Sequence, residues 1–399
     1  MGGMRGLIRG AFLAAVALGF LLILLSCKPT LPAKIGTIDF RAYWSASYLL
    51  RRGESSGDAN LVLQVERDRT GWNEGYPMMA WNPPWLLTLL APYTLVSFDR
   101  AVWWWIISNI LIVFLSASLL WPLDAQARLR SLGVYAAPLV AFSYSPTLIA
   151  IIAGQVNTLV LGGLVGYLFF RSRGHEGLAG ACLAFASVKP QLVYVTVPIL
   201  LLESLFRGNR RALVGFLTSM LGLIAFVILL RPASLLEYGS TARMGDLLMW
   251  ETPTLGGVLH RVTGWEWFKL SGVLVIPIAI SLWWRLGKKW HIRTVVDLTL
   301  LLSVITAPFG WSYDFIVLLI PIMRVITWAA DGALSWLEIS TLIIVLTTAD
   351  LLMYYERVRS PSEVYFAWIP FLIVAVYGFA WWRRAANAIS RAKPVTSFA

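Results

Sequence analysis

The sequence predicts an all-α polytopic membrane protein, and three observations lead to that fold class. Of its 399 residues, 58% are hydrophobic and only 14% are charged, whereas a soluble domain is about a quarter charged. Apolar runs of about 15 to 21 residues recur from end to end, close to the roughly 20 residues that cross a bilayer as a helix. The basic residues behind the net charge of +12 stand mostly in short clusters between those runs, as is typical of membrane proteins.

The apolar runs also predict how many helices cross the bilayer. A first run covers 6–26, and a long polar stretch over 28–80 follows it. The later runs cover 81–96, 101–121, 132–152, 156–170, 177–188, 191–206, 212–230, 267–284, 295–308, 314–329, 333–352 and 363–382. If every run except 81–96 crosses, residues 1–399 form a single bundle of about 12 transmembrane helices.

Orientation follows from the basic residues in short loops, which stay on the cytoplasmic side. With the topology above, six clusters fall on one side of the membrane. They are Arg5/Arg9, Arg128/Arg130, Arg171/Arg173, Arg207/Arg210/Arg211, Arg285/Lys288/Lys289/Arg293 and Arg383/Arg384/Arg391/Lys393. We therefore expect a multi-pass protein of the inner (plasma) membrane with both termini in the cytoplasm. Most of the net charge is explained in this way, and no nucleic-acid partner is expected.

Five of the segments need a separate interpretation. The polar stretches 28–80 and 231–265 become the first and second extracytoplasmic loops. The run 81–96 opens with Pro83-Pro84, and prolines suit the start of a helix. We expect it to be a short interfacial helix on the outer surface. The runs 156–170 and 177–188 reach only about 18 to 23 Å as helices, so they are tilted, thin the bilayer locally or end in a cavity.

Several classes of chemistry are excluded by what the sequence lacks. The two cysteines, Cys27 and Cys182, lie far apart in apolar surroundings, which is no basis for a disulfide framework or a metal site. The three histidines do not cluster, and no phosphate-binding glycine loop or nucleophile elbow occurs. A primary pump driven by ATP is therefore not expected, and neither a metal nor a cofactor is expected.

Asp39 is the first candidate for chemistry. It follows the first apolar run by about a dozen residues and has apolar and aromatic neighbours. Burial raises the pKa of a carboxyl group, whereas Arg41 nearby would oppose that shift. A carboxylate in such a place can act as a general base toward a hydroxyl. The alternative is a structural role as a helix N-cap or in a surface ion pair.

Polar turns between apolar runs provide the next candidates, and the predicted topology places them all on the outer side. Gln155 and Asn157 carry amides that suit sugar hydroxyls or a phosphate, although they could simply cap helices. Lys189, followed by Pro190-Gln191, interrupts an otherwise apolar stretch. A cation there favours an anion such as a lipid-linked phosphate, or else its side chain reaches the headgroups. Because polar groups at membrane depth tend to line functional cavities, these turns indicate a wet cavity open to the outside.

The remaining candidate residues also belong to outer segments. Asn82 precedes Pro83-Pro84 in a rigid turn, which has a purely structural reading as well. Trp311, Tyr313 and Asp314 form a late polar element that could stack on a sugar or supply a second carboxylate, with helix capping as the competing account. In the second loop, His260 is the one histidine on the outer side. The outer-loop arginines Arg41, Arg243 and Arg261 are candidates to neutralise a phosphate.

The order of these motifs resembles glycosyltransferase family 87, whose members are polyprenol-phosphate-mannose-dependent mannosyltransferase-like proteins with a GT-C fold. The resemblance extends over about residues 37 to 321. The matching elements are Asp-Phe-x-x-Tyr (Asp39, Phe40, Tyr43) with a small-residue helix ending at Gly53, Pro83-Pro84, Gly-Gln-x-Asn (Gly154, Gln155, Asn157), Lys-Pro-Gln (Lys189, Pro190, Gln191) and Pro-x-x-Trp-x-x-Asp (Pro308, Trp311, Asp314).

The resemblance implies an inverting transfer of a sugar, with mannose as the family's best-known case, from a polyprenyl-phosphate sugar to an acceptor hydroxyl on an envelope lipid or glycan. It also implies that Asp39 is the base. One departure from the family matters. Many relatives have a histidine where this chain has Tyr313, so no role for that histidine can be transferred to Tyr313 or Asp314.

Two rival functions remain open at this stage. A flippase or secondary transporter for lipid-linked sugars would need polar residues along the whole transmembrane path and often has inverted repeats. The polar turns here lie on one predicted face and no repeat is visible. A non-catalytic partner in envelope assembly is the other rival, and in that case Asp39 would only cap a helix.

Overall fold

The computed structural model describes residues 35–125, 133–244, 250–359 and 362–392, and within them every regular element is helical. The first predicted span, 6–26, and Cys27 lie outside the described residues. The α-helices are α2 (Ile38–Arg51), α3 (Ala59–Thr70), α4 (Pro84–Leu90), α5 (Phe98–Asp124), α6 (Gly133–Ser143), α7 (Ser145–Ala153), α8 (Asn157–Ser172), α9 (Glu176–Ala186), α10 (Thr196–Phe206), α11 (Arg210–Leu230), α12 (Ser234–Met244), α13 (Leu255–Thr263), α14 (Gly272–Arg285), α15 (Ile292–Thr306), α16 (Leu319–Ala330), α17 (Trp336–Arg359) and α18 (Trp368–Ala392). The 3₁₀ helices are η1 (Ala91–Leu95), η3 (Pro190–Leu192), η4 (Glu266–Ser271), η5 (Gly287–Lys289), η6 (Ser312–Leu318) and η7 (Glu363–Phe366).

Six helical segments of the described chain are long and apolar enough to cross a membrane. They are Phe98–Asp124, Arg210–Leu230, Glu266–Arg285, Ser312–Ala330, Trp336–Arg357 and Glu363–Asn387. The pair α6 and α7, bent by 68° at its break, would be a seventh. The protein is therefore an all-α, multi-pass membrane protein, but the expected count of about 12 spans is not confirmed.

Several apolar runs are shorter as helices than the sequence suggested. Helices α9 and α10 have 11 residues each, and α7 has nine. At 1.5 Å per residue an 11-residue helix is about 16 Å long, roughly half of the hydrocarbon thickness. A helix of that length does not cross the bilayer alone.

The polar stretch 28–80, expected as a loop, is largely helical where it is described. Helix α3 begins at Asp58, whose carboxylate accepts from the backbone N–H groups of Asn60 and Leu61. It ends at Gly71, which has a φ of 70°, the left-handed conformation that glycine adopts at low cost. The small-residue helix expected before Gly53 is confirmed as α2. The second polar stretch likewise contains α12 and α13.

The segment 81–96 forms α4 and η1 rather than one long helix. Helix α4 has seven residues with Pro84 at its first position, where a missing N–H costs nothing. Such a short helix is about 10 Å long, so it does not span a bilayer. This agrees with the expectation that 81–96 does not cross, while its place at the membrane interface stays a prediction.

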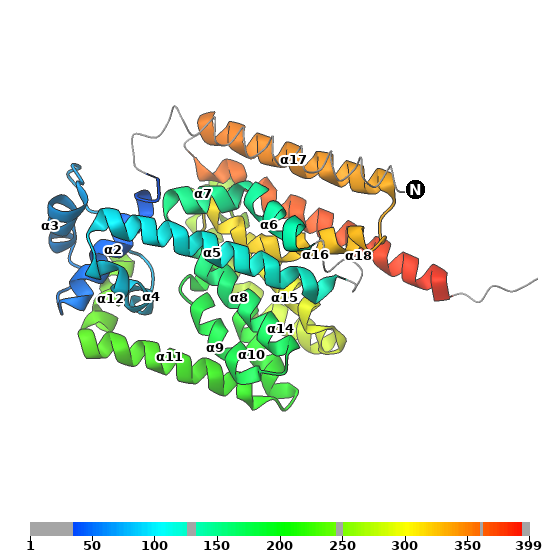
Figure 1. Ribbon diagram of the computed structural model, residues 1–399, viewed down its shortest axis with the longest axis horizontal. Helices are drawn as coiled ribbons and strands as arrows, with labels where there is room; N and C mark the ends of the chain where they lie inside the picture. The colour runs from blue at the N-terminus through cyan, green and yellow to red at the C-terminus, as the bar shows by residue number, and fades with distance from the viewer. Residues whose placement is uncertain (1–34, 126–132, 245–249, 360–361, 393–399) are drawn as a thin grey trace, which may run out of the picture.

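Figure 1 shows how the short polar helices relate to the long apolar ones. Helices α2, α3, α4 and α12 gather at one end of the long helices α5 and α11. Helix α8 packs on α9 and α9 on α11, through small residues. A Cβ atom at Gly180 would lie 1.8 Å from the backbone oxygen of Ala212, so only glycine allows this close approach.

The other end of α5 carries a buried cluster of charges that joins four helices. Asp297 on α15 binds Arg293 at 2.9 Å and Arg324 on α16 at 2.6 Å. Asp124, the last residue of α5, binds Arg293 at 3.1 Å. The hydroxyl of Tyr377 on α18 donates to Asp297 at 3.0 Å. The cluster therefore ties α5, α15, α16 and α18 together.

Basic clusters predicted to share one side are neighbours in the structure. Arg207 donates to the backbone oxygens of Lys288 and Trp290, and Arg171 and Arg207 both bind Glu203. These contacts bring three of the six clusters to one region. Which side of the membrane they face stays a prediction.

Candidate active site

Asp39 lies at the start of α2 and meets the turn between α7 and α8. Its Oδ2 accepts a hydrogen bond from Nε2 of Gln155 at 2.7 Å. The Oε1 of the same amide accepts from the hydroxyl of Tyr43 at 3.1 Å. Within the described part of the chain, Oδ1 of Asp39 has no hydrogen-bond partner and Asp39 has no ion pair, while its side chain is partly exposed. The carboxylate is thus oriented from one side and open on the other.

Two glycines allow the backbone contact that brings Asp39 to Gln155. The N–H of Gly36 donates to the backbone oxygen of Ile152 at 2.7 Å. Gly154 has a φ of 74°, and a Cβ atom there would lie 2.4 Å from the oxygen of Gly36. Trp105 on α5 donates its indole N–H to the oxygen of Gly154 at 2.9 Å. A side chain at 154 would push the start of α2 away, so glycine is required.

A buried ion pair joins the turn that contains Lys189 to the turn that contains Asp314. Nζ of Lys189 lies 2.7 Å from Oδ1 of Asp314, with side-chain exposures of 3% and 1%. Asn157 donates to Asp314 at 3.4 Å and to the backbone oxygen of Tyr313. The N–H of Trp311 donates to Oδ2 of Asp314 at 3.0 Å. The charge of Lys189 is therefore already balanced within the protein.

Asp39 lies close enough to the ion pair of Lys189 and Asp314 for their charges to affect its pKa. Burial raises the pKa of Asp39 above its usual value, the hydrogen bond from Gln155 opposes that shift, and the positive charge of Lys189 opposes it further. Asp314 adds a raising contribution and Arg357 a lowering one. The net direction is upward, which makes Asp39 a stronger base than an exposed aspartate.

Arg357 and Glu363 belong to the same neighbourhood, although sequence reasoning did not select them. Glu363 accepts from the N–H of Ser312 at 2.8 Å and forms an ion pair with Arg357. The side chain of Arg357 is 41% exposed and that of Glu363 is 11% exposed. Arg357 is thus a solvent-accessible cation beside the candidate base.

A cluster of aromatic side chains lies beside Lys189 and was also missed. Trp250 contacts Trp81, Phe309 and Trp311 with ring centroids 5.9, 5.9 and 5.2 Å apart. All four rings are partly exposed. The ring of Trp311 stacks on Tyr313 at 5.9 Å, and Nζ of Lys189 lies 4.9 Å from the centroid of Tyr313. The rings come from three distant segments and provide an apolar wall next to the polar groups.

A family model matches residues 81–308, described as glycosyltransferase family 87. The match covers more than half of the 399 residues. The chain belongs to glycosyltransferase family 87. No curated protein and no solved structure matches it significantly.

The match includes two of the polar turns of this family 87 glycosyltransferase. Gln155, Asn157 and Lys189 lie inside the matched region, whereas Asp39 precedes it and Asp314 follows it. The roles of those two carboxylates therefore depend on the geometry of the site. Gln155, the hydrogen-bond partner of Asp39, lies in the matched region. Lys189, the ion-pair partner of Asp314, lies there too.

Other predicted site residues of the glycosyltransferase lie apart from Asp39. Arg41 turns toward α3, where its Nε donates to Thr70 and its guanidinium lies 4.7 Å from the ring of Trp72, because residues two apart on a helix do not share a face. Arg261 forms an exposed ion pair with Glu251 at 2.7 Å. The side chain of Arg243 is outside the described structure.

The last three predicted residues have different surroundings. Asn82 donates to the backbone oxygen of Val188 at 3.0 Å, which fastens the segment before α4 to the residue next to Lys189. Gln191 is partly exposed at the end of the same turn. His260 lies on α13, and its Nδ1 is buried without a hydrogen-bond partner. Among the residues that are described, no group of three or more His, Cys, Asp or Glu side chains is placed to hold a metal ion.

Proposed function

We propose that this membrane glycosyltransferase moves a sugar such as mannose from a polyprenyl-phosphate sugar to a hydroxyl of an envelope glycolipid or glycan. The transfer takes place on the extracytoplasmic face and inverts the anomeric centre. Family membership supports the glycosyltransferase activity. The observation that carries the finer proposal is Asp39, a carboxylate held by Gln155 through one oxygen, with no hydrogen-bond partner for the other oxygen among the described residues.

Asp39 acts as the general base in this proposal. Its free oxygen takes the proton of the acceptor hydroxyl while that hydroxyl oxygen forms a bond to the anomeric carbon of the donor. The bond from the anomeric carbon to the phosphate oxygen breaks, and the polyprenyl phosphate leaves with the electron pair. Attack opposite the leaving group inverts the anomeric centre, as in inverting hydrolases.

Arg357 supplies positive charge for the leaving phosphate. Its side chain is 41% exposed, and its partner Glu363 also accepts from the N–H of Ser312, so Glu363 keeps one donor when Arg357 turns toward a phosphate. The charge of Lys189 is balanced by Asp314, so Lys189 contributes a fixed N–H donor rather than net charge. Arg41 and Arg261 are less suited, since their side chains lie elsewhere.

The short helices around Lys189 fit a lipid-linked donor. Helices α9 and α10 are about 16 Å long and meet at the turn that contains Lys189. A turn between two half-length helices lies within the thickness of the bilayer rather than at its surface. The phosphate of a membrane lipid can reach that depth from the side, and the aromatic cluster around Trp250 offers an apolar path for its first isoprene units.

The decisive experiment is transfer from radiolabelled polyprenyl-phosphate mannose, glucose or arabinose to extracted envelope lipids in vesicles. The Asp39→Asn variant should lose about 10²- to 10⁴-fold of the activity, as expected for removal of a general base. Asp58→Asn is the matched control, because Asn also caps a helix, and it should keep full activity. Activity retained in Asp39→Asn would exclude Asp39 as the base. Movement of the donor across the bilayer without transfer would support the flippase alternative.

A further inference from the structure

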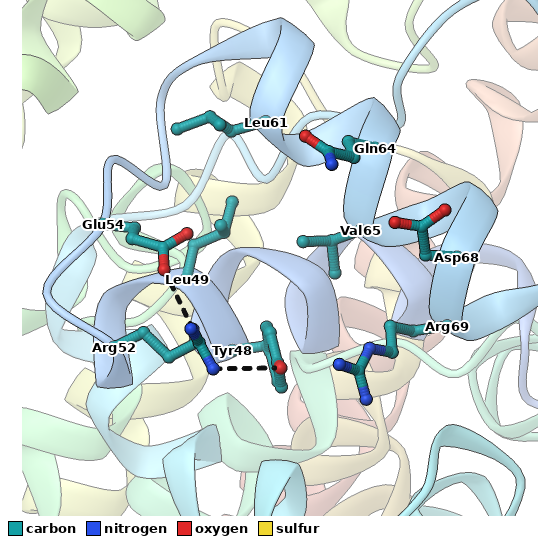
Figure 2. Close-up of a pocket in the computed structure, with 9 residues that line it drawn as sticks. All are labelled: Tyr48, Leu49, Arg52, Glu54, Leu61, Gln64, Val65, Asp68 and Arg69. Atoms are coloured by element: carbon teal, nitrogen blue, oxygen red, sulfur yellow. Dashed lines mark hydrogen bonds and ion pairs between the residues drawn. The ribbon is translucent and has the colours of Figure 1, made fainter.

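A hollow lies between α2 and α3, away from the Asp39 carboxylate. Figure 2 shows this pocket between the C-terminal half of α2 and α3. Its volume is about 180 Å³. Its lining residues are Tyr48, Leu49, Arg52, Glu54, Leu61, Gln64, Val65, Asp68 and Arg69. That volume holds roughly six water molecules, which is small compared with a site for a drug-sized ligand.

The pocket has an apolar floor and a polar rim. Leu49, Leu61 and Val65 form the floor. The rim carries two guanidinium groups, two carboxylates and one amide. These groups belong to Arg52, Arg69, Glu54, Asp68 and Gln64. The formal charges of the rim therefore cancel, which does not favour a phosphate or another anion.

The rim groups are held loosely enough to exchange partners. Arg52 binds Glu54 at 2.9 Å, but both side chains are at least 40% exposed, so the pair is worth little. The guanidinium of Arg69 lies 5.4 Å from the ring centroid of Tyr48. Tyr48 is itself fixed by stacking on Trp44 at 5.3 Å. The rim thus combines one rigid aromatic ring with adaptable donors and acceptors.

This combination fits a neutral polyhydroxylated ligand. Sugar hydroxyls both donate and accept hydrogen bonds, so a rim of guanidinium, carboxylate and amide groups can satisfy them together. The apolar floor suits the C–H face of a sugar ring, and charged partners give stronger hydrogen bonds than neutral ones. A lipid tail would leave the rim unsatisfied at a cost.

We propose that the pocket between α2 and α3 binds a sugar unit of the acceptor glycan, remote from the hydroxyl that is glycosylated. This inference rests on the proposed glycosyltransferase function. Helix α2 connects the two places: Asp39 stands in its first turn and Tyr48 nine positions later, about 14 Å along the axis. That separation matches a short oligosaccharide whose one end is bound and whose other end reaches the base. Binding energy from such a remote unit improves the use of the acceptor.

Direct binding tests the pocket independently of transfer. Saturation-transfer NMR in the Asp39→Asn background, which removes turnover, would use mannotriose, maltotriose and an arabinan trisaccharide as probes. We expect saturation transfer to at least one of them, lost in Arg69→Ala and in Asp68→Asn. The matched control is Arg67→Ala on the same helix, an exposed arginine outside the pocket that donates to the backbone oxygen of Glu74; it should bind as the parent does.

Steady-state kinetics of the otherwise intact enzyme complete the test. Arg69→Ala and Asp68→Asn should raise KM for the acceptor about tenfold, the effect of losing one charged hydrogen bond, with KM for the donor unchanged. Absence of saturation transfer to all three saccharides would overturn the inference, as would binding that survives both substitutions or displacement of the saccharide by inorganic phosphate. Because binding is measured without turnover, failure of the pocket is distinguishable from failure of Asp39 as the base.

Discussion

At the end of the bundle near Asp124, both oxygens of each carboxylate contact a guanidinium, whereas Asp39 at the other end has an amide as its hydrogen-bond partner. The oxygens of Asp297 bind Arg293 and Arg324 at 2.9 and 2.6 Å. Asp39 leaves one oxygen free within the described residues and is partly exposed. The charge of Asp297 is therefore compensated inside the protein. Asp39 keeps an oxygen that can accept a hydrogen bond or a proton from a substrate.

This difference separates charges with a structural role from the carboxylate that we propose as the base. A buried carboxylate with all its partners in place has no remaining acceptor to offer and a high cost if a partner is lost. A carboxylate oriented by one neutral amide can accept a proton without breaking an ion pair. The same chain therefore contains two kinds of polar cluster with opposite responses to substitution.

The largest effect on stability is expected at the fully paired cluster. Asp297→Asn leaves Arg293 and Arg324 short of charge compensation and should lower the free energy of unfolding by about 5 kcal/mol, the upper end for a broken buried pair. Thermal unfolding in detergent measures it. Asp39→Asn should unfold within about 0.5 kcal/mol of the parent. Equal destabilisation by the two substitutions would remove the distinction between the clusters.

Lys189 and Asp314 form an intermediate case, since they are paired and also lie beside Asp39. Lys189→Met should cost about 3 kcal/mol by leaving Asp314 buried and unpaired. Adding Asp314→Asn should recover most of that loss. Transfer activity should stay low in the double variant, because the fixed ammonium donor of Lys189 is still missing. Recovery of both stability and activity would assign the pair a purely structural role.

Substitution of Glu66 on α3 gives the smallest effect on stability, and the size of that effect depends on pH. Burial raises the pKa of Glu66 to about 7, although the N–H of Met78 donates to it. Between pH 4.5 and 7 the folded state holds a proton that the unfolded state has released, so stability falls as pH rises. Glu66→Gln should abolish that fall and raise the stability above pH 7 by about 1 to 3 kcal/mol.

Melting temperatures from pH 3 to 8 provide the measurement, because Glu66 titrates in the upper part of that range and Glu237 in the lower part. Glu237→Gln is the control of opposite sign, because the hydrogen bonds from Arg231 lower the pKa of Glu237. The stabilisation from Glu237 is complete above its unfolded pKa and is lost as pH falls through the folded one. Parallel pH profiles for the parent and Glu66→Gln would show that Glu66 is ionised in the folded protein.

Local signals in the sequence predicted part of the site. Pro84 opens a helix and Gly154 forms a turn, as their restricted or permissive backbones require. The three polar turns with Gln155, Lys189 and Asp314 do come together with Asp39, because polar groups between apolar helices are brought to the same end of a bundle.

The missed features depend on contacts between distant segments. Arg357 looks like an ordinary basic residue at the end of an apolar helix, and only folding places it near Asp39. The rings of Trp81, Trp250 and Phe309 are 59 or more positions apart and form a cluster that no local pattern encodes. Helix lengths were predicted only in part: the sequence placed the interruption at Lys189-Pro190-Gln191, but in the structure it extends from Ser187 to Val195.

The contact between Gly36 and Gly154 has a consequence for how the protein is made. Asp39 is synthesised 116 positions before Gln155, which orients it. A nascent chain that extends only to α5 thus carries the carboxylate without the turn that orients it. The proposed base is positioned only when the α7–α8 turn docks against the start of α2, so the site forms after the first long apolar helix has been made.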